Sequence, residues 1–304
     1  EDWTSNTVSS GYKLKAAPTT SWTDYADTSW YTKNKLTYYL TNEAQLAGLA
    51  KLVNSGTTFE GVTIELFRDL DMKAHIWTPI GTSKNPFKGV FNGYGNTVSG
   101  LYYRNIDTYN VGLFGYIKNP NKLDPSQNIG ACTIKNVVVD DSYFYANDRV
   151  GGIVGHMESG TIVTSCTNYG YVKADQKSSS SSYQSCAGGI AGEAVGATVS
   201  NCVNYGTVYS EGRLTGGIVG YAHTKASVVN NANFGSVTGS SRVGGIVGCS
   251  EDKGTQVCSN YNIGTVRPND GSNAYIGAIV GRNVDDKGTV MYNYYLADCA
   301  KGGN

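Results

Sequence analysis

Short apolar segments bounded by turn residues recur along most of the chain. Close copies of one segment, Gly-Gly-Ile-Val-Gly, occupy residues 151–155, 188–192, 216–220, 244–248 and 277–281. A second segment, Asn-x-Gly-x-Val, follows each of the first four copies, and the spacing is 28 or 29 residues where nothing is inserted. The clearest insertion is the serine-rich stretch 177–185, which we predict to be a loop. This period indicates a repeat architecture whose neighbouring units bury one continuous core.

Each repeat contains three β-type segments separated by turn residues. They are the Gly-Gly-Ile-Val-Gly segment, a middle segment such as residues 198–202, and the Asn-x-Gly-x-Val segment. Three strands in about 28 residues suit one coil of a parallel β-helix, whereas a propeller blade needs four strands and about 40 residues. A leucine-rich repeat needs a leucine ladder, which this region lacks. We therefore predict an all-β solenoid, a parallel β-helix of about seven or eight coils.

Stacked coils place equivalent residues in columns. We expect the isoleucines of the first segment to point inward, although the adjacent valines compete for that place because neighbouring strand residues face opposite sides. The valines of the middle segment and those that close the second segment should also face the core, and an Asx column should lie at a corner and bond the backbone. The columns are Ile153, Ile190, Ile218, Ile246 and Ile279; Val163, Val199, Val228 and Val257; Val172, Val208, Val237 and Val266; and Asp140, Asn168, Asn204, Asn233 and Asn262.

The region before the repeats carries a helix signal. Asn42 is placed to cap a helix N-terminus with Gln45 three residues on, and Asn-Ser-Gly at 54–56 stops the helix. We predict a helix over about residues 43–53 that covers the open strand edges of the first coil. The chain then divides into an irregular extension, residues 1–40, and a β-helix with a helical cap, residues 41–304. The apolar helix face comprises Leu46, Leu49, Ala50 and Val53.

Composition agrees with a β-rich protein and excludes several classes. Glycine makes up 39 of 304 residues and tyrosine 23, while the formal net charge is zero. A nucleic-acid-binding protein would normally carry a basic excess. No run of about 18 apolar residues could span a membrane. No signal peptide is visible at the start of the chain, so we expect either a cytosolic protein or the mature form of a secreted or cell-surface protein.

Several segments together resemble the GLUG-motif repeat proteins. The resemblance covers roughly residues 38–296 and implies a right-handed parallel β-helix in a secreted or surface-attached bacterial protein of adhesin-like type, with no catalytic residues to transfer. The same repeat flanks the catalytic domain of IgA-specific metallopeptidases, which implies a second possible role as an accessory region of such an enzyme. The segments are LTNEAQL at 40–46, VNSG at 53–56, FEG at 59–61, DLD at 69–71, WTPIG at 77–81 and FKGVFNG at 87–93, followed by the GGIVG repeats.

The titratable residues form no catalytic or metal-binding motif. His75, His156 and His223 stand apart on different coils, so the His-Glu-x-x-His zinc motif is absent. A polysaccharide lyase or glycosidase would need clustered carboxylates, and the available pairs fall in framework segments or turns. We therefore expect no catalytic residue, no metal site and no cofactor, and keep a carbohydrate-active β-helix enzyme as the enzymatic alternative. The pairs are Asp69/Asp71, Asp140/Asp141, Glu251/Asp252 and Asp285/Asp286.

The seven cysteines contain no Cys-x-x-Cys pair, and their odd number leaves at least one thiol free. Cys166 and Cys202 align in one column, which Val138 precedes and which continues with Asn231 and Asn260. In-register neighbours rarely offer the dihedral near 90° that a disulfide needs. We predict that the thiols are mostly free.

Tyrosines provide the only candidate binding surface. If the valines that close the second segment face inward, the positions between them face outward. Broad rings with polar tips on one outer face suit sugars or a partner protein; the alternative is that like residues stack because coils do. We expect a non-enzymatic scaffold that binds a host or microbial glycan or a surface protein. The tyrosines of this face are Tyr143, Tyr145, Tyr169, Tyr171, Tyr205 and Tyr209.

Overall fold

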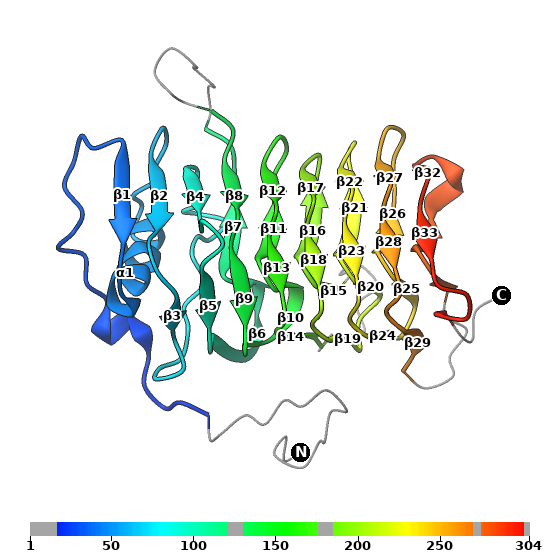
Figure 1. Cartoon of the computed structure of the whole chain (residues 1–304), viewed down its shortest axis with the longest axis horizontal. Coiled ribbons are helices and arrows are strands. Elements are labelled where there is room, and N and C mark those ends of the chain that lie inside the picture. Colours follow the sequence, from blue (N-terminus) through cyan, green and yellow to red (C-terminus); the bar gives the residue numbers. More distant parts are fainter. Residues whose placement is uncertain (1–16, 121–129, 176–184, 270–274, 301–304) are drawn as a thin grey trace.

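The computed structural model describes residues 17–120, 130–175, 185–269 and 275–300, and these form a parallel β-helix. The strands of successive coils lie side by side along the long axis in Figure 1, and they pair in parallel. Within the described residues the largest run of equivalent strands has nine members, one per coil. This exceeds the predicted seven or eight coils, because the first strands precede the recognisable repeats.

Four sheets make up the walls. The first contains β1 (Thr37–Leu40), β2 (Thr63–Leu66), β4 (Val90–Asn92), β8 (Thr133–Lys135), β12 (Ile162–Thr164), β17 (Thr198–Ser200), β22 (Ser227–Val229), β27 (Gln256–Cys258) and β32 (Thr289–Met291). The second contains β3 (Leu70–Asp71), β5 (Thr97–Ser99), β9 (Val138–Asp140), β13 (Thr167–Asn168), β18 (Val203–Asn204), β23 (Ala232–Asn233), β28 (Tyr261–Asn262) and β33 (Tyr294–Tyr295).

The third sheet joins two strands of each coil through the long strands β6 (Tyr102–Val111) and β10 (Tyr143–Gly151). Its other strands are β14 (Tyr171–Ala174), β19 (Val208–Ser210), β24 (Val237–Gly239), β29 (Val266–Pro268), β15 (Cys186–Gly188), β20 (Leu214–Gly216), β25 (Arg242–Gly244) and β30 (Tyr275–Gly277). The fourth sheet contains β7 (Phe114–Ile117), β11 (Val154–Met157), β16 (Ala191–Val195), β21 (Val219–His223), β26 (Val247–Ser250) and β31 (Val280–Asn283).

Interior coils contain five short strands rather than the three predicted segments. The coil of residues 227–250 passes through β22, β23, β24, β25 and β26 in turn. Its Gly-Gly-Ile-Val-Gly segment spans a bend, since the chain leaves the third sheet at Gly244 and enters the fourth at Val247. A Cβ atom on Gly244 would lie 2.0 Å from the carbonyl oxygen of Val247. The bend therefore requires glycine at this position.

This bend also decides which apolar column faces the core. Ile246 and Val247 both have no exposed surface, and the equivalent residues of the other interior coils are buried in the same way. The predicted isoleucine column is confirmed. The valine column is buried as well, because the bend interrupts the alternation that would otherwise turn one of the two outward. The middle-segment valines and the valines that close the second segment are buried too, as predicted.

Buried asparagines form the predicted corner ladder along the second sheet. Asn204 Nδ2 donates to Asn233 Oδ1 at 2.8 Å, and Asn233 Nδ2 donates to Asn262 Oδ1 at the same distance. Each Nδ2 also donates to the carbonyl oxygen two residues ahead, for example from Asn233 to Gly235 at 3.0 Å. The ladder therefore satisfies polar backbone groups at a corner that is fully buried.

Two alignment predictions were wrong by one residue. Asn168 pairs with Val139, so exposed Asp140 is not part of the asparagine ladder. The same register places Val137, not Val138, in the column of Cys166. The cause is one additional residue at this corner of the earlier coil, where Asp141 takes a positive φ of 41°.

The N-terminal end is closed by α1 (Glu43–Asn54), one residue longer than predicted. Asn42 accepts a hydrogen bond from the backbone N–H of Gln45 at 2.9 Å, which confirms the cap. The four predicted face residues are buried. Strand β1 pairs with β2, so the β-helix includes residues 37–40 of the predicted extension. Two short 3-10 helices, η1 (Trp22–Tyr25) and η3 (Val284–Asp286), complete the described elements.

Residues 1–16 of the extension lie outside the described residues, and so does the predicted loop 177–185 except for Ser185. In the described part of the chain, helices long and apolar enough to cross a membrane are absent.

All seven cysteines are free thiols in the structure, and six of them are buried. Burial raises the thiol pKa, for example well above the usual value at Cys202. We expect a thiol reagent to count seven groups per chain under denaturing, non-reducing conditions. In the native protein only the half-buried Cys258 should react quickly, and Cys258→Ser should remove that fast phase. A denatured count of one would instead mean three disulfides.

Candidate functional site

The predicted tyrosines do not share one flat face, because a corner divides them into two groups. The first group lies where the second sheet ends. Tyr169 and Tyr205 are each 45% exposed, and their rings stack at 4.7 Å with an interplanar angle of 5°. Phe234 continues the stack at 4.8 Å from Tyr205, and Tyr261 meets Phe234 edge-on at 6.2 Å. We call these four residues the exposed aromatic column.

The second group lies on the third sheet and is more enclosed. Tyr143 stacks on Tyr171 at 5.4 Å, and both are half-buried. Burial raises the pKa of Tyr143 to about 12. Tyr145 is only 8% exposed, so the prediction that it faces solvent was wrong. Its ring is covered by Lys173, whose Nζ lies 4.6 Å from the ring centroid.

Tyr209, the last of the six, is half-buried on β19, where its hydroxyl donates to Glu211 at 2.9 Å. The two groups separate because the chain turns at Gly170 between β13 and β14. A Cβ atom there would lie 2.9 Å from the carbonyl oxygen of Ser142 and 3.1 Å from Asn168 Oδ1. Tyr169 and Tyr171 therefore project from different walls of the β-helix.

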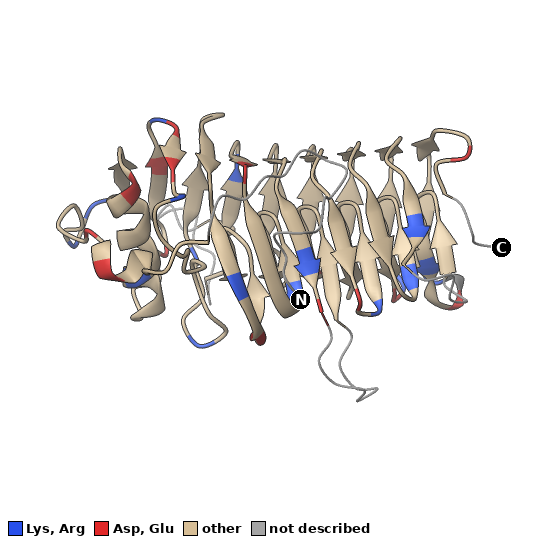
Figure 2. Cartoon of the chain, turned by 90° about the horizontal axis from the view of Figure 1, so that it is seen from below, with Lys and Arg blue, Asp and Glu red and all other residues tan. Residues whose placement is uncertain are grey.

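Ring geometry determines which contacts the exposed aromatic column can make. Tyr169, Tyr205 and Phe234 are nearly parallel and stacked along the axis, so each ring covers the face of its neighbour. Solvent reaches mainly the ring edges and the tyrosine hydroxyls. Figure 2 shows that charged residues of both signs are scattered along the molecule rather than gathered into one strongly charged surface. The column is thus an apolar ridge with hydroxyl tips.

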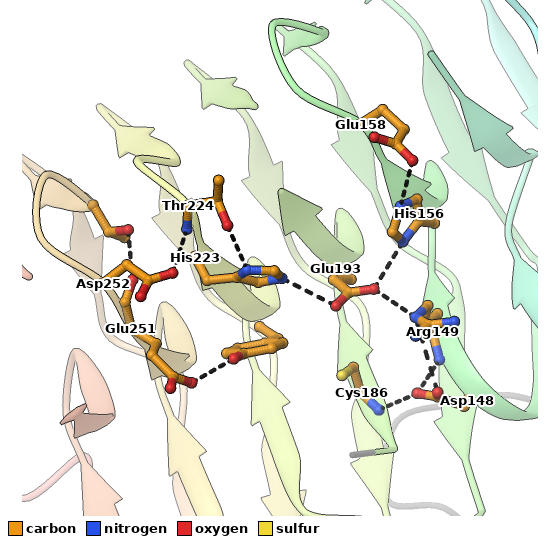
Figure 3. Close-up of polar contacts among 12 residues, drawn as sticks. Asp148, Arg149, His156, Glu158, Cys186, Glu193, His223, Thr224, Glu251 and Asp252 are labelled. Carbon is orange, nitrogen blue, oxygen red and sulfur yellow. Dashed lines mark hydrogen bonds and ion pairs between the residues drawn. The ribbon is translucent and has the colours of Figure 1, made fainter. Parts of the chain in front are cut away.

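A second arrangement, which the sequence patterns did not predict, lies on the fourth sheet and centres on Glu193 (Figure 3). This carboxylate is 7% exposed. Its Oε2 lies 2.8 Å from His156 Nδ1 and 2.5 Å from Arg149 Nε, and its Oε1 lies 3.2 Å from His223 Nε2. Although burial alone would raise the pKa of Glu193, the hydrogen bonds with His156 and His223 and the charge of Arg149 hold it well below its usual value.

Aromatic rings and further carboxylates flank this network. Tyr116 stacks on His156 at 4.4 Å, and its hydroxyl donates to Glu158. Tyr221 stacks on His223 at 4.3 Å, and its hydroxyl donates to Glu251. Desolvation, followed by the hydrogen bond to the carboxylate, raises the pKa of both tyrosines.

The Glu193 network is built as an ion-pair cluster that joins three coils. Both carboxylate oxygens already have donors, so neither is free to act as a base on a substrate. Among the described residues, groups of three or more side chains arranged to hold a metal ion are absent. Some of the carboxylates named as enzymatic candidates also have partners: Asp71 pairs with Lys73, Asp252 accepts a hydrogen bond from the Thr224 N–H, and the exposed Asp285 pairs with Lys287 at 2.9 Å.

A simple signal in the sequence could have found this network. The residue directly after each copy of the repeated Gly-Gly-Ile-Val-Gly segment falls in one column of the fourth sheet. Titratable and aromatic side chains at this position stand out, because the repeated segment that precedes it contains only glycine and apolar residues. Its members are Tyr116, His156, Glu193, Tyr221, Cys249 and Arg282.

These features define the class of protein as a parallel β-helix solenoid. No protein-family model matches the chain, and no curated protein sequence matches it. Among solved structures, the fold is similar to that of a Bacteroides ovatus protein provisionally described as an immunoglobulin A1 protease, with a TM-score of 0.62 and 21% sequence identity. The similarity covers 87% of this chain and 76% of that one. At this identity it shows a common fold.

Proposed function

We propose that this chain is a non-enzymatic, adhesin-like scaffold in a secreted or cell-surface bacterial protein, and that it binds its ligand through the exposed aromatic column. The observation that carries the proposal is the row of rings from Tyr169 to Tyr261, each 37–45% exposed on a wall fixed by backbone pairing between coils. Apolar rings held open to solvent on a rigid support are typical of recognition surfaces. Membership of the GLUG-motif repeat proteins, which the sequence segments suggest, is part of this proposal.

The column favours a protein ligand over a glycan. A sugar binds best across a whole ring face, and here the stacked rings cover one another's faces. A protein surface can instead pack apolar side chains against the ring edges and accept hydrogen bonds from the hydroxyls of Tyr169 and Tyr205. Tyrosine is enriched at such interfaces because it combines apolar area with a polar tip.

The test is a binding screen on secreted glycoproteins, mucin and glycan arrays, followed by substitution of the column. The triple variant Tyr169→Ser, Tyr205→Ser and Phe234→Ser should weaken binding to the identified ligand by about tenfold or more, because central aromatic residues dominate interface energies. The control is Tyr39→Ser, which removes a 53% exposed tyrosine from β1. Equal affinity of the triple variant and the control would refute a role for the column.

A second candidate function is an accessory, non-catalytic region of a larger secreted enzyme, such as an IgA-directed peptidase. The fold shared with the Bacteroides ovatus protein supports it. Immunoglobulin A1 is therefore included in the same screen. Binding of immunoglobulin A1 that depends on the column would favour this role, whereas column-dependent binding of other ligands alone would favour the adhesin-like role.

A further inference from the structure

A partly open pocket of about 150 Å³ lies between α1 and η1, at the end of the β-helix where Figure 1 shows the helix. On the helix side it is lined by two alanines, Ala47 and Ala50, which lie one turn apart. Larger apolar side chains of the same helix pack into the main core. The space therefore exists because α1 presents only methyl groups at these two positions.

Two buried tryptophans, Trp22 and Trp77, complete the apolar lining of this pocket. The indole nitrogen of Trp22 donates to the carbonyl oxygen of Met72 at 2.8 Å, and that of Trp77 donates to the carbonyl oxygen of Gly112 at 3.1 Å. Because both N–H groups already have acceptors within the protein, the tryptophans offer a ligand only the carbon atoms of their rings. The inner part of the pocket thus suits an apolar group, whereas the hydroxyls of a sugar would lose their hydrogen bonds there.

The volume of the pocket limits the apolar group to about one six-membered ring. An apolar cavity of about 150 Å³ holds a molecule of the size of benzene, and ligands of drug size need about 300 Å³ or more. The pocket therefore accepts a single ring, either from a small molecule or from one side chain of a larger ligand.

The outer part of the pocket carries a basic residue, Lys51. Its side chain is exposed and forms no ion pair within the described part of the chain. The carbonyl groups at the C-terminal end of α1 do not need this cation, because they already accept hydrogen bonds. The flexible lysine side chain is thus available to pair with an anionic group at the mouth of the pocket. The donors to the helix carbonyls are the backbone N–H groups of Ser55, Gly56 and Thr57 and the side-chain amide of Asn85.

We propose that this pocket binds an aromatic carboxylate, with its ring against Trp22 and Trp77 and its carboxylate paired with Lys51. The ring leaves water for an apolar site, while the carboxylate stays at the exposed mouth and loses little hydration. A free phenyl-substituted acid has this chemistry, and so does a peptide whose last residue is phenylalanine. The site is separate from the exposed aromatic column, and the proposal does not depend on the function proposed for that column.

The test is a titration of the full chain with hydrocinnamate, a phenyl ring joined to a carboxylate by two methylene groups, followed by NMR. The indole N–H resonances of Trp22 and Trp77 should shift, while that of Trp30, which does not line the pocket, should stay in place. A ligand of this size should bind with a dissociation constant on the order of 0.1–1 mM. Hydrocinnamide, its neutral analogue, should bind about two- to fivefold more weakly, because it lacks the charge that pairs with Lys51.

A peptide that ends in phenylalanine is titrated in parallel to distinguish the two sources of this chemistry. Tighter binding of the peptide than of hydrocinnamate would assign the site to the C-terminus of a partner peptide. Weaker binding of the peptide would assign it to a free aromatic acid.

Two variants separate the parts of the site. Ala50→Leu fills the pocket from the helix and should weaken the binding of hydrocinnamate at least about tenfold. Lys51→Met removes the charge and should weaken hydrocinnamate about two- to fivefold while leaving hydrocinnamide unchanged. Because Lys51 is exposed, this second variant decides the matter even if Ala50→Leu fails to fold.

The matched control is Lys253→Met, which removes an exposed lysine from the turn between β26 and β27 and should change neither affinity. The proposal is overturned if the resonances of Trp22 and Trp77 stay in place at about 10 mM hydrocinnamate. It is also overturned if folded Ala50→Leu binds as tightly as the unsubstituted protein, or if Lys51→Met has no more effect than the control.

Discussion

Replacing Asn233 with leucine should lower the free energy of unfolding by at least about 3 kcal/mol. Asn233 is fully buried in the middle of the ladder, and the substitution removes its bonds with Asn204, Asn262 and Gly235. Three buried polar groups then lose a partner, at a cost of about 1–3 kcal/mol each. Leucine fills a similar volume, so the loss reports hydrogen bonding rather than a cavity.

Denaturant unfolding of the two proteins measures this difference. The control is Thr265→Leu, which makes a comparable polar-to-apolar change at an exposed position of the next coil and should change stability by no more than about 0.5 kcal/mol. If Asn233→Leu cost as little as the control, the ladder would not be a source of stability.

Glu193→Gln should lower the free energy of unfolding at pH 7 by about 2–4 kcal/mol, because it leaves the half-buried Arg149 beside a neutral partner. The difference from the unsubstituted protein should shrink at low pH. The folded pKa of Glu193 is depressed, so its contribution is complete above the unfolded pKa of about 4.3 and is lost as pH falls toward the folded value. At pH 3 the difference should therefore be smaller by about 1.5–2 kcal/mol.

The measurement is unfolding of both proteins at pH 7 and pH 3. Glu211→Gln provides a matched control, since Glu211 is exposed and accepts one hydrogen bond, from Tyr209. This control should change stability by about 1 kcal/mol or less. An effect of Glu193→Gln that is equally small, or that grows between pH 7 and pH 3, would contradict the electrostatic account of the network.

The coil period, the buried columns and the capping helix could be predicted because each depends on local patterning. Ile153 and its equivalents recur in every full copy, and Asn42 and Gln45 form a cap within four residues. The bend inside the repeated segment could not be predicted, since Ile246 and Val247 are both apolar and only the close approach at Gly244 shows where alternation breaks. The additional residue near Asp141 could not be predicted either, because a single inserted residue does not change the repeat pattern on either side of it. The predicted alignments of Asp140 and Val138 were therefore wrong by one position.

The candidate sites could be predicted from the sequence less completely than the fold. Alternation predicted that the tyrosines near the closing valines face outward, and this holds for Tyr169 and Tyr205. It could not show that the turn at Gly170 divides the set or that Lys173 covers Tyr145. The residue after each repeated segment places His156 and Glu193 in one column, but that column does not show the contacts of Glu193 with Arg149 and His223.

The direction of the hydrogen bonds between coils has a mechanical consequence. These bonds run along the long axis, from one coil to the next, so a force that pulls the two ends apart loads all the strand ladders of an interface at once. The interfaces between coils are loaded in series, so the weakest of them sets the force at which the whole molecule yields. When a β-helix is pulled from its ends, all hydrogen bonds between two neighbouring coils must therefore break together. A single coil with weakened pairing to its neighbour lowers the force at which the whole molecule unfolds.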